Sequence, residues 1–211
     1  MSATIEPMTV PSRAEAASLL ASLDPPPWFR AHACAVADVA AWLGQRLEAV
    51  GTPVDRGAVE AAALLHDVDK VLPEDDEARR LPHGEGSAAW LTRLGHAELA
   101  RLVADHPVTR LADGAAYRRW AAFSSREGRI VAYADKRAGQ RLESMADRFD
   151  GWARRYPDTW DAATWTRVRA RADRLEADVC AAARVRPDEV RRLEWAEAAM
   201  RETTMAGRST R

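Results

Sequence analysis

The stretch WFRAHACAVADVAAWLGQRLEAV, residues 28–50, sets the pattern for the whole chain. Its apolar residues recur in steps of three and four, which places them on one face of an α-helix. That face consists of Trp28, Val36, Val39, Leu43, Leu47 and Val50. His32 lies on the same face. The stretch therefore predicts a long helix, ending at Gly51, whose core-facing side carries an imidazole.

The segments on either side have the same helical period, and alternating runs rich in Val, Ile and Thr are absent. We therefore predict an all-α protein, a helical bundle with a C-terminal helical extension. The expected helices span residues 12–22, 28–50, 55–67, 85–94, 96–105, 125–156, 160–184 and 188–203. We expect a charged loop over 72–84, an irregular segment or short helix over 107–123, and a disordered tail after Thr203.

The composition limits the classes of function. The 211 residues suffice for one sizeable domain, or for a domain with a helical appendage. A formal net charge of -1 argues against general nucleic-acid binding, which needs a basic surplus. We see neither a signal peptide nor an apolar run of roughly 18 residues, the length of a membrane span. With only Cys34 and Cys180, we expect a cytoplasmic protein without disulfides, away from membranes.

Three more predicted helices carry a histidine or an acid on their apolar face, namely His66, His106 and Asp135. The neighbours on these faces are Val59, Ala62 and Ala63 for His66, Leu99, Leu102 and Val103 for His106, and Val131, Ala138, Leu142, Met145 and Phe149 for Asp135. Each of these polar groups is therefore expected to point into the protein, where it needs a partner.

A bound cation would satisfy these groups together. A buried carboxylate such as Asp135 is costly without a positive partner, and the facing stripes offer no obvious Lys or Arg. Imidazole and carboxylate ligands suit iron, manganese or zinc. A lone histidine on an apolar face is more often a hydrogen-bonded core residue than a metal ligand. Four such interruptions, including the adjacent pair His66 and Asp67, favour a metal site, whereas His96 is expected at the surface.

These residues resemble the HD-domain superfamily of metal-dependent phosphohydrolases. The motifs are His32 in WFRAHACAVADVA, His66 and Asp67 in AALLHDVDK, and Asp135 in RIVAYADKR. The resemblance covers about residues 28–150. It implies that His32, His66, Asp67 and Asp135 hold one metal ion.

Two further histidines stand where two-metal members of that superfamily have theirs, His83 in LPHGEG and His106 in VADHPV. By resemblance, Asp67 would bridge to a second metal ion held by these two. The implied cofactors are two divalent ions, iron or manganese first, with magnesium, zinc, nickel or cobalt as alternatives. This arrangement resembles the bacterial enzymes that hydrolyse diadenosine tetraphosphate symmetrically. One departure is Asp69, where a common form of the motif has glycine.

The implied reaction is hydrolysis of a phosphoester or phosphoanhydride of a nucleotide or dinucleotide by a metal-activated hydroxide. Asp67 and Lys70 are the expected catalytic residues. Lys70 is also expected to bind substrate phosphate, since only two of the 31 basic residues are lysines. Lys136 and Arg137 either bind substrate or form a surface ion pair. Asp69 either orients a ligand imidazole or caps a loop.

We expect three parts in the chain: an N-terminal helix and linker over 1–27, the phosphohydrolase domain over 28–156, and a helical extension over 157–211. The extension is expected to pack on the domain or to form a homodimer rather than bind nucleic acid. Two other functions stay open on the same fold. One is a non-catalytic module that binds metal or nucleotide, and the other is a di-iron oxygenase.

Overall fold

The computed structural model describes residues 10–209, which contain helices and no strand. The prediction of an all-α protein is confirmed. The α-helices are α1 (Arg13–Ser22), α2 (Pro27–Ala49), α3 (Arg56–Leu65), α4 (Glu85–Arg93), α5 (Ala97–Val103), α6 (Thr109–Ala112), α7 (Gly114–Phe123), α8 (Arg126–Arg137), α9 (Met145–Arg155), α10 (Ala162–Ala183) and α11 (Trp195–Ser209). Three short 3-10 helices lie between them: η1 (Val68–Lys70), η2 (Glu77–Arg80) and η3 (Pro187–Glu189).

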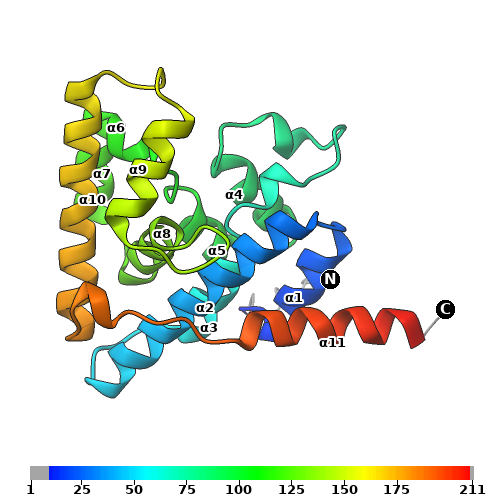
Figure 1. Cartoon of the computed structure of the whole chain (residues 1–211). Helices are drawn as coiled ribbons and strands as arrows, with labels where there is room; N and C mark the ends of the chain where they lie inside the picture. The colour runs from blue at the N-terminus through cyan, green and yellow to red at the C-terminus, as the bar shows by residue number, and fades with distance from the viewer. Residues whose placement is uncertain (1–9, 210–211) are drawn as a thin grey trace, which may run out of the picture.

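Helix α2 forms the centre of the fold and packs against α3 and α8 (Figure 1). Its predicted apolar face is confirmed over most of its length, because Val36, Val39, Leu43 and Leu47 are fully buried. Trp28, at the start of that face, is 52% exposed. The helix begins at Pro27, whose fixed φ suits the first turn and whose missing N–H needs no partner there.

The later helices wrap around this centre. Helix α10 stands along one side of the molecule and packs against α8, α2 and α6, while α11 crosses the base beside α1 and α2 (Figure 1). The first and last helices are therefore neighbours. The three-part division at residues 27/28 and 156/157 stays a prediction, although the extension does pack on the helices that precede it.

The single long helix predicted over 125–156 is wrong. Helix α8 ends at Arg137, Ala138 adopts an extended conformation, and α9 begins after Ser144. Ser144 accepts a hydrogen bond from the N–H of Asp147, which is the usual cap of a helix start. The reverse turn between the helices, closed by a bridge between Ala138 and Leu142, breaks the apolar face on which Asp135 was placed.

The helix predicted over 188–203 is displaced towards the C-terminus. Pro187 starts only the short turn η3, and α11 begins at Trp195 and continues to Ser209. The disordered tail expected after Thr203 is therefore wrong as far as Ser209, and residues 210–211 lie outside the described part. Residues 107–123, expected to be irregular or to hold a short helix, contain α6 and α7.

Two expectations drawn from composition can be compared with the described residues. Cys34 and Cys180 are both buried and unpaired, as expected. Within residues 10–209, no helix combines the length and the apolar character required to cross a membrane.

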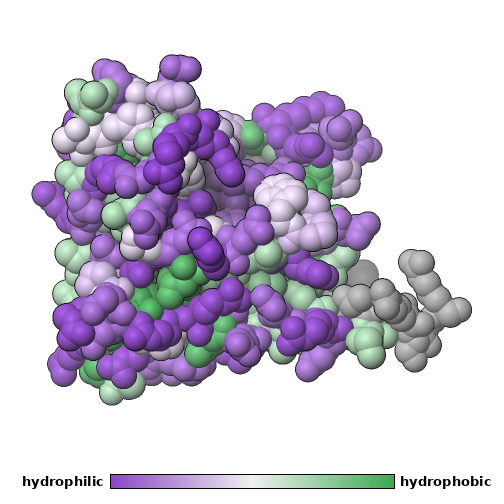
Figure 2. Space-filling view, in the orientation of Figure 1, coloured by the Kyte–Doolittle hydropathy of each residue, from purple (hydrophilic) through white to green (hydrophobic). Residues whose placement is uncertain are grey.

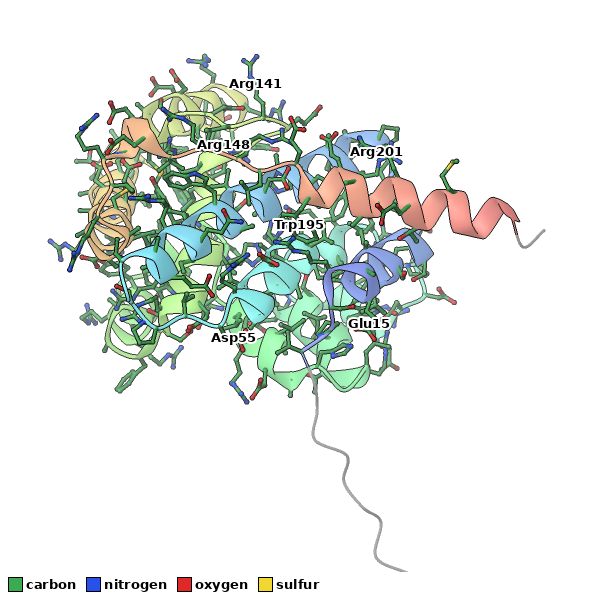
Figure 3. The ribbon with its side chains drawn as sticks, turned by 90° about the horizontal axis from the view of Figure 1, so that it is seen from below. Glu15, Asp55, Arg141, Arg148, Trp195 and Arg201 are labelled. Carbon is green, nitrogen blue, oxygen red and sulfur yellow. The ribbon has the colours of Figure 1, made fainter. Side chains whose placement is uncertain are left out.

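Helix α11 is fastened to α2 through Asp38, an acid that lies on α2 and is fully buried. Its carboxylate accepts hydrogen bonds from the Ala196 N–H at 3.1 Å and from Arg192 at 3.1 Å. Its backbone carbonyl accepts from the Leu193 N–H. Trp195 lies at the start of α11 close to α1 (Figure 3), with Arg13 above its ring. Asp38 thus caps α11 from another helix.

Replacement of Asp38 should loosen α11. Burial raises the pKa of its carboxyl to about 6, against the opposing hydrogen bonds from Ala196 and Arg192. Asp38→Ala removes the acceptor and should lower the melting temperature by about 5 °C, or about 2 kcal/mol. Asp38→Asn keeps an oxygen acceptor and should lower the melting temperature by less than Asp38→Ala does.

The matched control is Asp178→Ala, because Asp178 is 51% exposed and pairs only with Arg129 at the surface. Such a pair contributes little, so this variant should melt within about 1 °C of the wild type. Circular dichroism melting measures all three. Equal melting of Asp38→Ala and Asp178→Ala would contradict the capping role.

Candidate metal centre

The structure brings together all six residues predicted to hold metal. They come from separate segments: His32 from α2, His66 and Asp67 from the end of α3, His83 from the segment before α4, His106 from the segment between α5 and α6, and Asp135 from α8. Asp67 lies at the middle of the group. One carboxylate oxygen, Oδ1, is 3.0 Å from His106 Nε2 and 3.2 Å from His83 Nε2. The other, Oδ2, is 3.3 Å from His32 Nε2.

Asp135 completes the side of the cluster away from His83. Its Oδ1 atom is 3.6 Å from His32 Nε2 and 3.7 Å from His66 Nε2. Three groups of ligand atoms, each within 4.8 Å of one another, are His32, His66 and Asp135; His66, Asp67 and His106; and Asp67, Asp69 and His83. The cluster therefore has enough donors for more than one ion.

The end of α3 lets two adjacent residues face the same point. Side chains next to each other on a helix point about 100° apart. Helix α3 stops at Leu65, two residues earlier than predicted, and Asp67 has φ −110° and ψ 12°. The turn η1 follows at once and brings Lys70 back beside Asp67.

Each imidazole in the cluster is oriented through its other nitrogen. The Nδ1 atoms of His32, His66 and His106 lie 2.6–2.8 Å from the backbone carbonyls of Gly139, Ala63 and Val103, respectively. A carbonyl oxygen can only accept, so these Nδ1 atoms carry the proton. His83 Nδ1 lies 2.9 Å from the carboxylate of Asp69.

It follows that the Nε2 atoms present lone pairs to the centre whenever these rings are neutral. His32 Nε2 and His66 Nε2 are 3.2 Å apart, and both face carboxylate oxygens. Lone pairs at this distance repel unless a proton or a metal ion lies between them. Nitrogen and carboxylate ligands, with second hydrogen bonds that fix each ring, are the donor set of a divalent metal site. The residues present fit such a site.

Three groups of the cluster, Asp67, Asp135 and His106, have the protonation states that ligands need. Burial raises the pKa of Asp67 and of Asp135, but the surrounding imidazoles and Lys136 outweigh it and hold both pKa values well below the ordinary range. Burial lowers the pKa of His106 to about 4, against the opposing effect of Asp67. Two carboxylates and one neutral imidazole are thus available near pH 7. Against burial, Asp67 and Asp69 raise the pKa of His83 to about 9. Likewise against burial, Asp67 and Asp135 raise the pKa of His32. An ion would therefore displace a proton from His83 on binding.

Two ammonium groups accompany these carboxylates, contrary to the expectation that no cation faces them. Lys70 Nζ lies 2.5 Å from Asp67 Oδ2, and Lys136 Nζ lies 3.7 Å from Asp135 Oδ2. The Lys70 side chain is 42% exposed. Lys136 is buried, and its Nζ donates to the carbonyls of His106 and Ala132. Because Lys136 lies beside it, the buried charge of Asp135 does not by itself require a metal ion.

The structure does not bring Arg137 to the cluster. Its guanidinium is buried and donates to Tyr133, Glu176 and the Pro187 carbonyl, on the side that faces α10. It is therefore not the surface ion pair considered from sequence. Lys136 is buried as well, so neither residue lies at the surface.

Asp69 orients a ligand imidazole and also fixes the loop that carries it. Its Oδ2 atom accepts from His83 Nδ1 and from the Gly84 N–H, both at 2.9 Å. Gly84 has φ +86°, and a Cβ there would lie 2.7 Å from the Ala104 carbonyl. The Oδ1 atom of Asp69 is buried without a hydrogen bond, and Asp69 belongs to one of the three groups of possible metal ligands. Asp69 therefore does both things that were considered from sequence: it orients an imidazole and it fixes a loop.

A cavity of about 280 Å³ opens onto the cluster at His32, His83, Asp135 and Lys70. Its far side consists of Arg148, Trp152, Tyr156, Trp160 and Trp165. In the space-filling view, the surface is hollowed between the side formed by α9 and the side formed by α4 (Figure 2). Sequence analysis missed Arg148, because it was placed on a continuous helix where nothing distinguishes it from the other arginines.

The fold and the site together define a class of protein: an all-helical protein with a buried cluster of His and Asp side chains at the end of a cavity. The profile of the HD domain family matches residues 29–139, which include every member of the cluster. The chain belongs to the HD domain family, whose members are generally metal-dependent hydrolases. No curated protein and no solved structure matches the chain.

Metal binding should depend on Asp67, since its carboxylate lies within 3.5 Å of all four imidazoles. We expect Mn²⁺ at about 100 times its dissociation constant to raise the melting temperature of the wild type by about 5–10 °C. Asp67→Ala should abolish the metal-induced rise, whatever its own melting temperature. Differential scanning calorimetry with and without the ion measures the rise.

The matched control is His96→Ala, which removes the one histidine outside the cluster. This variant should keep the full metal-induced rise. An equal rise in Asp67→Ala would mean that the ion binds elsewhere.

Proposed function

We propose that the protein is a metal-dependent phosphohydrolase that cleaves a phosphoester or phosphoanhydride of a nucleotide or dinucleotide. The observation that carries the proposal is the convergence of Asp67, four imidazoles and Asp135 at one end of a cavity that also holds Lys70. Family membership supports the reaction class. The six-residue donor set supports the two-metal subgroup that resembles the symmetrical diadenosine tetraphosphate hydrolases.

The six residues would hold the ions in two sets that share Asp67. His32, His66 and Asp135 lie on one side of it, and His83 and His106 lie on the other. When bound, divalent ions supply Lewis acidity and lower the pKa of a coordinated water. The protein supplies the fixed orientation of the donors, so that little reorganisation is needed on binding.

The reaction exchanges one bond at phosphorus for another. A water oxygen forms the new P–O bond, the P–O bond to the leaving group breaks, and the leaving oxygen ends with a proton. Lys70 is the chain's own group for the phosphate: its ammonium lies at the cavity and its neighbour Asp67 raises its pKa, against the opposing effect of burial. A charged Lys70 therefore neutralises negative charge on the phosphate oxygens.

Hydrolysis by the purified protein tests the proposal. The protein is reconstituted separately with Mn²⁺, Fe²⁺ and Mg²⁺ and given nucleoside monophosphates, triphosphates, cyclic nucleotides, diadenosine tetraphosphate and guanosine tetraphosphate. We expect turnover of one class, lost in Asp67→Ala. Metal-loaded protein that hydrolyses none of them would contradict the proposal. Oxygen consumption would then indicate the oxygenase, and binding alone the regulatory module.

The role of Lys70 has its own test. Lys70→Met keeps the length of the side chain but removes the charge, and should lower kcat/KM by about a hundredfold. Lys70→Arg should recover part of this loss because the positive charge is restored. The control is Arg101→Met, whose side chain is 71% exposed and lies outside the cavity. Equal rates for Lys70→Met and Arg101→Met would exclude Lys70 from phosphate binding.

A further inference from the structure

The cavity beside the cluster has two chemically different ends. His32, His83, Asp135 and Lys70 form one end, and an aromatic wall, defined as Trp152, Tyr156, Trp160 and Trp165, forms the other. The wall comes from α9, from the segment that follows it and from the start of α10. All four of its residues lie beyond residue 139, so they are outside the part of the chain that matches the HD domain family.

The aromatic wall differs from the tryptophans of the core. Trp90 and Trp120 are 6% and 7% exposed, and their rings serve packing. Trp152, Trp160 and Trp165 are only partly buried, and Tyr156 is 52% exposed. Trp160 and Trp165 meet edge to face, with ring centroids 4.8 Å apart and planes at 67°. This geometry leaves ring surface available to a planar ligand in the cavity.

The side of the cavity that holds the aromatic wall also carries a positive charge. Arg148 lines the cavity, and its guanidinium is 4.5 Å from the centre of the Trp152 ring. Among the described residues, Arg148 has no carboxylate within ion-pair distance, and its Nε atom is buried without a hydrogen bond. A guanidinium that lines a cavity without an ion pair is available to an anionic ligand such as a phosphate.

We propose that the aromatic wall is a nucleobase subsite, with one base stacked on the ring of Trp160 or Trp165 and meeting the other ring at its edge, and with the attached phosphate between Arg148 and Lys70. This inference rests on the proposed function and names the part of the substrate that is recognised. A base has the flat π-face that such rings bind, and the phosphate matches the two cations. A cavity of about 280 Å³ suits one base-bearing unit rather than two, so the rest of a dinucleotide would lie outside it.

The test separates base recognition from phosphate recognition and from hydrolysis. Isothermal titration of the Mn²⁺-loaded protein compares two probes. One is methylenediphosphonate, which has no base and no hydrolysable bond, and the other is the β,γ-methylene analogue of ATP, whose integrity is checked by chromatography after each titration. We expect Trp160→Ala and Trp165→Ala each to weaken binding of the nucleotide analogue about tenfold or more. Their binding of methylenediphosphonate should be unchanged. Arg148→Met should weaken binding of both probes.

Two further variants serve as controls. Trp160→Phe keeps an aromatic face and should retain most of the affinity for the nucleotide analogue. If Trp160→Ala lost affinity only through misfolding, Trp160→Phe would not be expected to recover it. Phe123→Ala removes an aromatic ring that is 83% exposed and outside the cavity, and should bind both probes like the wild type. Equal affinity of wild type for the two probes, or equal effects of Trp160→Ala on both, would overturn the subsite.

The outcomes for the subsite and for the proposed function are independent. Base-dependent binding by a protein that hydrolyses nothing would leave the subsite standing and refute the enzyme. Hydrolysis that proceeds equally well on AMP and on ribose 5-phosphate, and is unchanged in Trp160→Ala, would leave the enzyme standing and refute the subsite.

Discussion

The lone pairs that converge on Asp67 are the constraint on which the rest of the structure depends. Four imidazoles and two carboxylates face one point, and each ring must be held there against repulsion by its neighbours. The carbonyls that hold three of the rings belong to the ends of helices: Ala63 and Val103 lie in the last turns of α3 and α5, and Gly139 follows α8. Helix ends leave carbonyls without intrahelical partners, so the same chain breaks that place the ligands also orient them.

The two lysines beside the cluster differ in their surroundings, and only Lys70 is placed for the proposed role in binding phosphate. Lys136 is buried and joins α8 to the segment after α5 through the carbonyls of Ala132 and His106. Burial lowers its pKa, against the opposing effect of Asp135, and in this position it cannot reach a ligand in the cavity without giving up those bonds. Lys70 is nearly half exposed and lines the cavity. Lys136 therefore stabilises the packing, whereas Lys70 is accessible from the cavity, although both lie beside a carboxylate of the cluster.

The site combines the part of the chain that matches the HD domain family with a part that lies beyond it. The residues that face the cluster lie within 29–139, the part that matches the HD domain family. The opposite side of the cavity is formed by α9, α10 and their connection, which pack on α8 and on each other. The α8 segment contributes to both parts, because it carries Asp135 and leads through the turn at Gly139 into α9. A reaction centre fixed by one set of helices can in this way be paired with recognition groups supplied by another.

The sequence by itself determined the helical class and the stripe of α2, because helical period is a local property. It also indicated His32, His66, His106 and Asp135 as polar groups on apolar faces, and the resemblance of its motifs to a known family completed the set of six candidate ligands. It could not place the ends of helices, since those depend on distant partners: the Gly139 carbonyl is held by His32, and the start of α11 by Asp38. For the same reason it misjudged the surroundings of the carboxylates, which have Lys70 and Lys136 beside them, and it overlooked Arg148. Only the tertiary structure decided which arginine faces the cavity and which, like Arg137, binds inside the protein, because nothing in a local pattern separates the two.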